Sequence, residues 1–230
     1  MERRSKKYKE AQKHIEKDKE YALGEGLSLA KKTSTTKFDS TVELHVALGV
    51  DPKHADQNIR GTVSLPAGTG KEVRVAVFAE IDDAKKAMTA GADFAGNEEM
   101  LTKLDKQDID FDVLIATPKL MAKLGKYAKV LGPKGLMPNP KSGTVNADVE
   151  KAVKEAKAGK IEYRVDSNGI IHTAIGKVSF SEQDLKKNID VILAAIKGAK
   201  PASVKSSYFK SAFLTTSMGP SVKLSLSEIQ

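Results

Sequence analysis

The chain has 230 residues, of which 40% are hydrophobic, so it can bury the core of one large domain or two small ones. Its 38 Lys and Arg against 30 Asp and Glu give a net charge of +8, which favours polyanionic partners, nucleic acid above all, without excluding a basic enzyme. Cysteine is absent, which excludes disulfides and thiolate metal sites. Because the start lacks an apolar leader and no run reaches the length of a membrane span, we expect a soluble, cytoplasmic chain with no membrane partner.

The first part of the chain predicts two helices and then a strand. Residues 5–22 have the charge density of a solvated helix, and residues 23–33 form a second helical stretch that two glycines weaken. In "KFDSTVELHVALGVDP", residues alternate between two faces of an expected strand. One face would carry Phe38, Ser40, Val42, Leu44, Val46 and Leu48, and the other would carry Lys37, Asp39, Thr41, Glu43 and His45. This alternation predicts a half-buried strand of an antiparallel sheet with one wet face.

The middle of the chain alternates short apolar runs with helical stretches. The apolar runs are "VRVAVFA" (73–79) and "FDVLIAT" (111–117), and the helical stretches cover 80–91, 97–106, 118–132 and 146–159. Apolar strands separated by helices predict a parallel sheet covered on both faces. Gly91 is placed to end the first of these helices, and either Asn146 or Asp148 to cap the last.

Strand patterns return at residue 160. The segment "KIEYRVDSNGIIHTAIGKVSF" predicts a hairpin around Asn168-Gly169, a pair that suits the positive φ of a tight turn. The segment "SEQDLKKNIDVILAAIKGA" predicts an amphipathic helix with Ser181 as its N-cap. Two final strands, broken at Gly219-Pro220, are predicted for "SSYFKSAFLTTSMGPSVKLSL".

These patterns predict an α+β outer domain that is split in sequence and interrupted by an inserted α/β domain. The outer domain, with an antiparallel sheet and helices, comprises residues 1–66 and 160–230; the three-layer, Rossmann-like inserted domain comprises residues 67–159. The insertion carries 15 Lys and Arg against 14 Asp and Glu, whereas the outer domain carries 23 against 16. We therefore expect the polyanion site on the outer domain.

The segment "PAGTGKE" (66–72) invites comparison with a phosphate-binding loop. Leu65 stands where that motif requires its first glycine, and Glu72 stands where it requires Ser or Thr. A strand rather than a helix comes next, so we interpret the segment as an interdomain connector.

The loop "GPKGLMPNPKSGTV" (132–145) is rich in glycine, proline and lysine. It matches no dinucleotide-binding fingerprint. It is not a nucleophile elbow around Ser142 either, because Pro140 stands at the position where that motif requires its first glycine. Its prolines exclude a helix or a central strand. We interpret it as a rigid corner, in which Lys134 and Lys141 either contact phosphate or serve no binding role.

No catalytic or metal site can be assembled from the sequence. The four histidines (His14, His45, His54 and His172) show no metal-ligand spacing, and no nucleophile, base and orienting group occur together. We expect no enzyme activity, no metal and no cofactor.

The outer-domain strands present hydroxyl groups beside aromatic and basic residues. On one wet face lie Lys37, Thr41 and Glu43, and a second strand places Ser211, Phe213, Thr215 and Ser217 on one parity. With Arg164 or Lys177 nearby, such a surface suits recognition of RNA by its backbone and 2′-hydroxyl groups. Ordinary strand composition explains the same residues equally well.

Five stretches resemble hallmark sequences of one protein family. They are "KFDSTVELHVALGVDP", "NIRGTVSLPAGTGK", "FDVLIATP", "LGPKGLMPNPKSGTV" and "FLTTSMGPSVKL". They occur in the family's order and span essentially the whole chain. The chain thereby resembles the family of large-subunit ribosomal protein L-one, the stalk protein, in its bacterial form.

The resemblance implies a non-enzymatic, two-domain protein of the large ribosomal subunit that is a monomer when free. Its split domain would bind large-subunit rRNA and form the mobile stalk beside the exit site, helping deacylated tRNA to leave. It would also repress translation by binding its own operon mRNA. The competing interpretation, an α/β enzyme or nucleotide binder that uses the middle domain, is favoured only by analogy of fold.

The resemblance and the strand patterns together predict the RNA-binding residues. They are Lys37, Phe38, Thr41, Glu43, Arg164, His172, Lys177, Ser211, Thr215, Ser217, Met218 and Gly219. One departure from the family is that Ser217 replaces a usual Thr, which keeps the hydroxyl and removes a methyl group.

Overall fold

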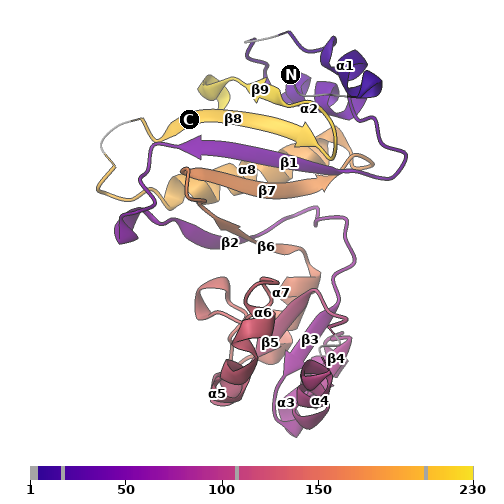
Figure 1. Ribbon diagram of the computed structural model, residues 1–230, viewed down its shortest axis with the longest axis vertical. Helices are drawn as coiled ribbons and strands as arrows, with labels where there is room; N and C mark the ends of the chain where they lie inside the picture. Colours follow the sequence, from indigo (N-terminus) through magenta and orange to yellow (C-terminus); the bar gives the residue numbers. More distant parts are fainter. Residues whose placement is uncertain (1–4, 17–18, 107–108, 205–206, 230) are drawn as a thin grey trace. The chain divides into compact units, whose positions relative to one another are not determined.

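The computed structural model describes residues 5–16, 19–106, 109–204 and 207–229. The chain divides into two compact units, which we call the split unit (residues 1–70 with 161–230) and the inserted unit (residues 71–160) (Figure 1). The first contains an antiparallel sheet built from distant segments, and the second a parallel sheet with helices, as the predicted fold class requires. In the described part of the chain, no helix has the length and apolar character needed to cross a membrane.

The split unit contains a four-stranded antiparallel sheet in the order β7-β1-β8-β9, and a two-stranded sheet of β2 and β6. Its elements are α1 (Lys6–Gln12), α2 (Leu23–Lys32), β1 (Thr41–Leu48), η1 (Ala55–Gln57), β2 (Arg60–Ser64), β6 (Lys160–Arg164), β7 (Ile170–Lys177), α8 (Glu182–Gly198), β8 (Phe209–Thr216), β9 (Val222–Leu224) and η5 (Leu226–Glu228).

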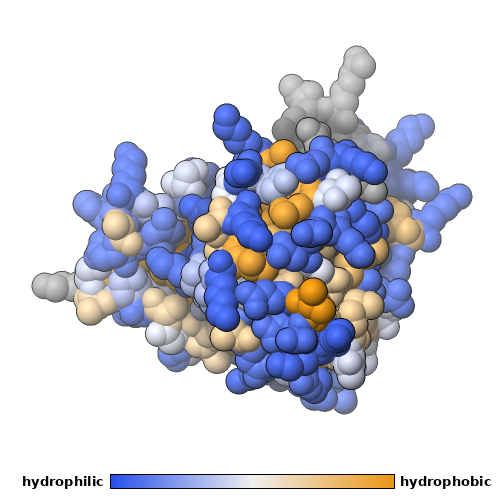
Figure 2. All heavy atoms as spheres, turned by 90° about the horizontal axis from the view of Figure 1, so that it is seen from below, coloured by the Kyte–Doolittle hydropathy of each residue, from blue (hydrophilic) through white to orange (hydrophobic). Residues whose placement is uncertain are grey.

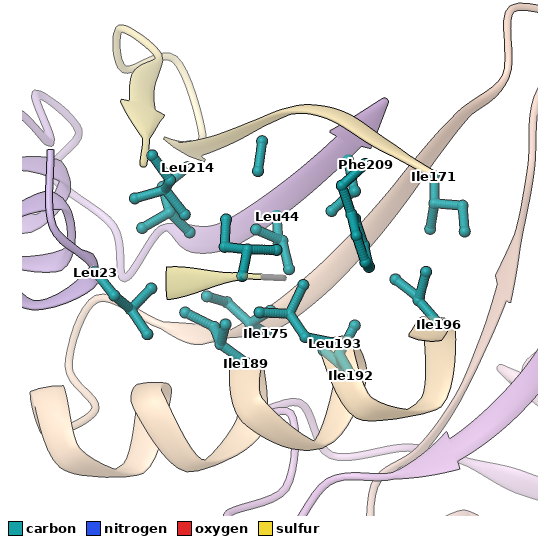
Figure 3. Close-up of a cluster of buried hydrophobic side chains, with 14 of the residues drawn as sticks. Leu23, Leu44, Ile171, Ile175, Ile189, Ile192, Leu193, Ile196, Phe209 and Leu214 are labelled. Carbon is teal, nitrogen blue, oxygen red and sulfur yellow. The ribbon is translucent and has the colours of Figure 1, made fainter. Parts of the chain in front are cut away.

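Helices α2 and α8 cover one face of the four-stranded sheet. Figure 3 shows Leu44, Ile175 and Leu214, from three different strands, packed with Ile189 and Ile192 of α8. In β1, burial alternates along the whole strand as its pattern predicts, because every second side chain enters this core. The opposite face of the sheet therefore stays accessible.

The predicted N-caps of α7 and α8 are confirmed. Ser181 Oγ accepts a hydrogen bond from the Asp184 N–H at the start of α8. At the start of α7, Asp148 rather than Asn146 is the cap, since its side chain accepts from the Lys151 N–H.

The inserted unit contains three parallel strands in the order β4-β3-β5. Its elements are β3 (Val75–Phe78), α3 (Ile81–Thr89), β4 (Phe94–Gly96), α4 (Glu98–Asp105), β5 (Val113–Ala116), η2 (Pro118–Leu120), α5 (Met121–Leu124), η3 (Gly125–Tyr127), α6 (Ala128–Leu131), η4 (Pro140–Ser142) and α7 (Val149–Lys157). Val75 and Val77 pack in one core with α3 and α7, whereas Ala76 and Phe78 pack in a second with α4 and α5. Both faces of the sheet are thus covered.

Three predicted elements differ from the structure. The helix expected over 5–22 ends at Gln12; part of that stretch (17–18) lies outside the described residues, and Tyr21 instead pairs with Leu224 at the edge of the sheet. The helix expected over 118–132 is a succession of short helical turns (η2, α5, η3 and α6), since it has glycine within it at Gly125.

The hairpin predicted around Asn168-Gly169 is also wrong in its pairing. The tight turn exists, and Gly169 has φ +79°, but only the single bridge between Val165 and Ile171 joins its two arms. Strand β6 pairs with β2, and β7 pairs with β1. The turn therefore passes the chain from one sheet to the other.

Candidate nucleic-acid interface

The accessible face of the four-stranded sheet gathers half of the predicted RNA-binding residues. We call it the open face; it consists of Thr41, Glu43, His45, His172, Ala174, Lys177, Ser211, Phe213 and Thr215. The strand register places Glu43 opposite Thr215, and His45 between Phe213 and His172. All of these side chains are at least partly exposed.

A β-bulge brings Lys177 onto the open face. Strict alternation would place Lys177 on the buried side with Ile175, but the register shifts between Val42 and Glu43. Beyond the shift, Lys177 pairs with Thr41, and its ammonium donates a hydrogen bond to Thr41 Oγ1 at 3.0 Å. An extra residue in one strand reverses the parity of the residues beyond it, which allows a side chain to be re-aimed.

Two histidines lie at the centre of the open face. His45 Nδ1 is 2.8 Å from His172 Nδ1, and His45 Nε2 is 2.9 Å from Thr215 Oγ1. The two Nδ1 atoms share one hydrogen, so one nitrogen donates and the other accepts. On the outer side, His172 Nε2 is 3.5 Å from Asp166 Oδ2. The result is a chain of polar groups across three strands.

The protonation of this chain is set by its surroundings. Burial lowers the pKa of His45 below its ordinary value and the neighbouring His172 lowers it further, whereas the Glu43 carboxylate opposes the shift. The pKa of Asp166 is lowered, chiefly because its carboxylate accepts a hydrogen bond from the Ile170 N–H. Both ring nitrogens of His45 are engaged within the protein, so the group that it offers to a base is its partly exposed aromatic face.

The turn after β8 places Met218 in solvent. The Gly219 N–H donates to the Thr216 carbonyl at 2.8 Å, and Met218 has φ +64° with 79% of its side chain exposed. Ser217 ties the turn to β1, because its N–H donates to the Thr41 carbonyl and its Oγ accepts from the Thr41 N–H. An exposed apolar side chain held in a left-handed conformation is unusual, and such residues concentrate at ligand sites.

Gly219 has a reason within the chain itself for lacking a side chain. A Cβ there would lie 2.2 Å from Thr216 Oγ1. Close approach of an RNA backbone is therefore not needed to explain the glycine at this position.

A family model described as the ribosomal protein L1p/L10e family matches residues 30–220. The chain belongs to this family. L1p/L10e proteins are ribosomal and non-enzymatic, which implies a structural, rRNA-binding role and excludes the alternative of an α/β enzyme. The matched range includes the whole open face and the turn up to Pro220.

Other predicted residues of this L1p/L10e chain extend the open face or lie elsewhere. Lys37 and Phe38 precede β1; Phe38 is 63% exposed because the alternation begins only at the strand, which corrects its assignment to the buried parity. Arg164 is exposed on β6, in the separate two-stranded sheet. Lys134 and Lys141 belong to the inserted unit.

The loop containing Lys134 and Lys141 is held by its own hydrogen bonds, as expected of a rigid corner. Asn139 Oδ1 accepts from the Lys141 N–H at 2.8 Å, and the Asn139 N–H donates to Thr144 Oγ1 at 2.8 Å. Ser142 Oγ donates to the Asn139 carbonyl. These bonds use backbone and hydroxyl groups and leave both lysine side chains exposed.

Sequence reasoning missed two parts of this surface. His45 was on the wet parity of its strand, but its contacts with His172 and Thr215 depend on strands more than 120 residues away. Ser5, Tyr8 and Thr35 line a hollow of about 530 Å³ with Met218. Nothing in the local sequence of the first helix signals this neighbour.

Proposed function

We propose that the open face and the turn at 216–219 bind a folded segment of large-subunit rRNA. Within the split unit, hydroxyls, two imidazoles, Phe213 and the exposed Met218 cover one sheet surface, a composition that suits sugars and unstacked bases. The predicted contacts Lys37, Phe38, Thr41, Glu43, Arg164, His172, Lys177, Ser211, Thr215, Ser217, Met218 and Gly219 belong to this proposal. The observation that carries it is the exposed, left-handed Met218 beside this hydroxyl-rich face.

The proposal extends to the role on the ribosome. By resemblance, the chain is the bacterial form of the family, cytoplasmic and monomeric when free. Its rRNA complex would form the mobile stalk at the exit site and assist release of deacylated tRNA. Residues 1–66 with 160–230 would be the RNA-binding domain, and residues 67–159 an inserted domain whose Lys134 and Lys141 are available to phosphate.

Hydrogen exchange of the full chain with and without a large-subunit rRNA fragment tests the site. We expect slower backbone exchange at 35–45, 170–177 and 209–219, and unchanged exchange along the middle of α8, which packs on the other side of the sheet. Protection that falls on α8 and spares the open face would contradict the proposed site.

Repression of the chain's own operon would use the same surface. An mRNA leader that imitates the rRNA site should displace labelled rRNA competitively. Binding of both RNAs to one chain at the same time would show that repression, if it occurs, uses another surface.

A further inference from the structure

The inserted unit carries a groove between α3 and the segment that joins β4 to α4. We call it the α3–α4 groove; its volume is about 950 Å³, and its lining comes from residues 80–89 and 95–99. Figure 2, viewed from below, shows apolar side chains exposed among hydrophilic ones on the face that includes these helices.

Two large apolar side chains of the groove are exposed. Ile81 is 75% exposed and Met88 is 51% exposed. They are seven residues apart on α3 and so lie on one side of the helix. The described residues include only two other large apolar side chains this exposed, Phe38 and Met218, and both belong to the proposed rRNA site. Exposed apolar groups that cluster in a hollow mark a contact with a partner.

The rim of the groove is acidic. Glu80, Asp82, Glu98 and Glu99 are exposed, and among the described residues none forms an ion pair, whereas the neighbouring Asp83 is paired with Lys86. Lys85 is the only cation of the lining. Acidic residues in the first turn stabilise helices, which accounts for part of this cluster. That effect does not account for the exposure of Ile81 and Met88.

The groove also contains an acceptor without a donor. Asn97 is the residue before α4, where Asn usually caps the helix, yet its side chain makes no capping bond. Its Oδ1 is buried and has no hydrogen-bond partner among the described residues. A partner that brings N–H groups to this end of the groove would supply what Asn97 lacks.

We propose that the α3–α4 groove docks a basic, amphipathic segment of another protein. Its apolar side chains would cover Ile81 and Met88, and its Lys or Arg side chains would pair with the four carboxylates. Four carboxylates against one lysine repel a phosphate backbone, so RNA is the wrong occupant although the whole chain carries +8. Complementary charge selects the basic partner and steers its approach.

Fluorescence anisotropy of the full chain with a labelled 12-residue peptide of alternating Lys and Leu tests the proposal. We expect binding that Met88→Ser and the double variant Glu98→Gln/Glu99→Gln each weaken at least tenfold. A peptide with Glu in place of Lys should not bind. The matched control is Glu72→Gln/Asp190→Asn, which removes two exposed carboxylates outside the groove and should bind as the wild type does.

Hydrogen exchange and rRNA affinity, measured on the same proteins, show where the peptide binds and whether RNA uses the same groove. Hydrogen exchange should show that the peptide protects 80–89 and 95–101, and rRNA affinity should be equal in the wild type and both groove variants. Equal peptide affinity in groove and control variants would overturn the proposal. Loss of rRNA binding in the groove variants would identify RNA as the occupant and overturn it as well.

Discussion

Met218 combines a strained backbone with an exposed side chain. It is the one residue other than glycine with positive φ in the described part of the chain, and its side chain packs little against the protein. A left-handed conformation costs a residue with a Cβ about 1–2 kcal/mol. A position selected for stability alone would hold glycine. The proposed contact of the Met218 side chain with rRNA accounts for a methionine at this position.

Replacing Met218 with glycine should therefore separate stability from function. For Met218→Gly we expect a free energy of unfolding equal to the wild type or up to about 1 kcal/mol higher, since glycine adopts positive φ readily. The affinity for rRNA should fall about five- to tenfold. Denaturant unfolding and filter binding on the same preparation measure both. Met88→Ala, at an exposed methionine of the inserted unit, should leave rRNA affinity unchanged; a Met218→Gly variant with full affinity would remove Met218 from the site.

His45 makes the stability of the split unit depend on pH. Because the pKa of His45 is lowered on folding, the unfolded chain binds more protons at mildly acidic pH. The corresponding stability is fully present above the ordinary histidine pKa of about 6.5 and is lost as pH falls toward the folded value. Melting temperatures at pH 7.5 and 5.5 should differ less in His45→Gln than in the wild type. The exposed His54→Gln serves as control, and an unchanged pH dependence in His45→Gln would contradict this account.

At the scale of elements, one buried amide joins α8 to the connector before the inserted unit. The Asn188 amide group donates to the carbonyls of Gly68 and Ile175, and its Oδ1 accepts from the Ala67 N–H. Gly68 and Gly70 both have positive φ. The glycine-rich segment at 66–72 is thus a connector held by α8 rather than a phosphate loop, as the sequence indicated.

Removing this amide should destabilise the split unit. Asn188→Ala removes the side-chain partner of one buried backbone group, at Ile175, and of two half-buried ones, at Ala67 and Gly68. We therefore expect a loss of about 2–4 kcal/mol in the free energy of unfolding. Gln183→Ala, on the exposed side of the same helix, should change it by less than about 0.5 kcal/mol. Both free energies of unfolding are measured by denaturant titration. Similar effects of the two substitutions would show that the hydrogen bonds of Asn188 contribute little to stability.

Local patterns predicted most elements because the sequence of each one shows either a regular periodicity or an unbroken apolar run. The alternation of β1 and the cap at Ser181 needed no knowledge of distant partners. The bulge that re-aims Lys177 and the pairing of β6 with β2 depend on strands elsewhere in the chain, so no local pattern reveals them. The same limit applies to the site. The alternation that places Ser211 and Thr215 on one side of their strand can be recognised in the sequence, whereas the contact between His45 and His172 cannot.

For the whole molecule, the positive charge should act mainly through the split unit. The segments 1–66 and 160–230 carry 23 Lys and Arg against 16 Asp and Glu. Lys37→Ala should reduce the slope of log affinity for rRNA against log salt by about 1, because one phosphate contact is lost. Lys123→Ala, at an exposed lysine of the inserted unit, should leave the slope unchanged. Equal slopes in all three proteins would place Lys37 away from phosphate.

The central claim is that rRNA lies on the open face, and two alanines in the same unit test it directly. Ala174 is exposed on the open face opposite Glu43, and Ala194 is exposed on α8, which packs on the other side of the sheet. Affinity for a large-subunit rRNA fragment should fall at least tenfold, about 1.4 kcal/mol, in Ala174→Glu and stay within twofold of the wild type in Ala194→Glu. Equal affinities in the two folded variants, or a greater loss in Ala194→Glu, would contradict the account.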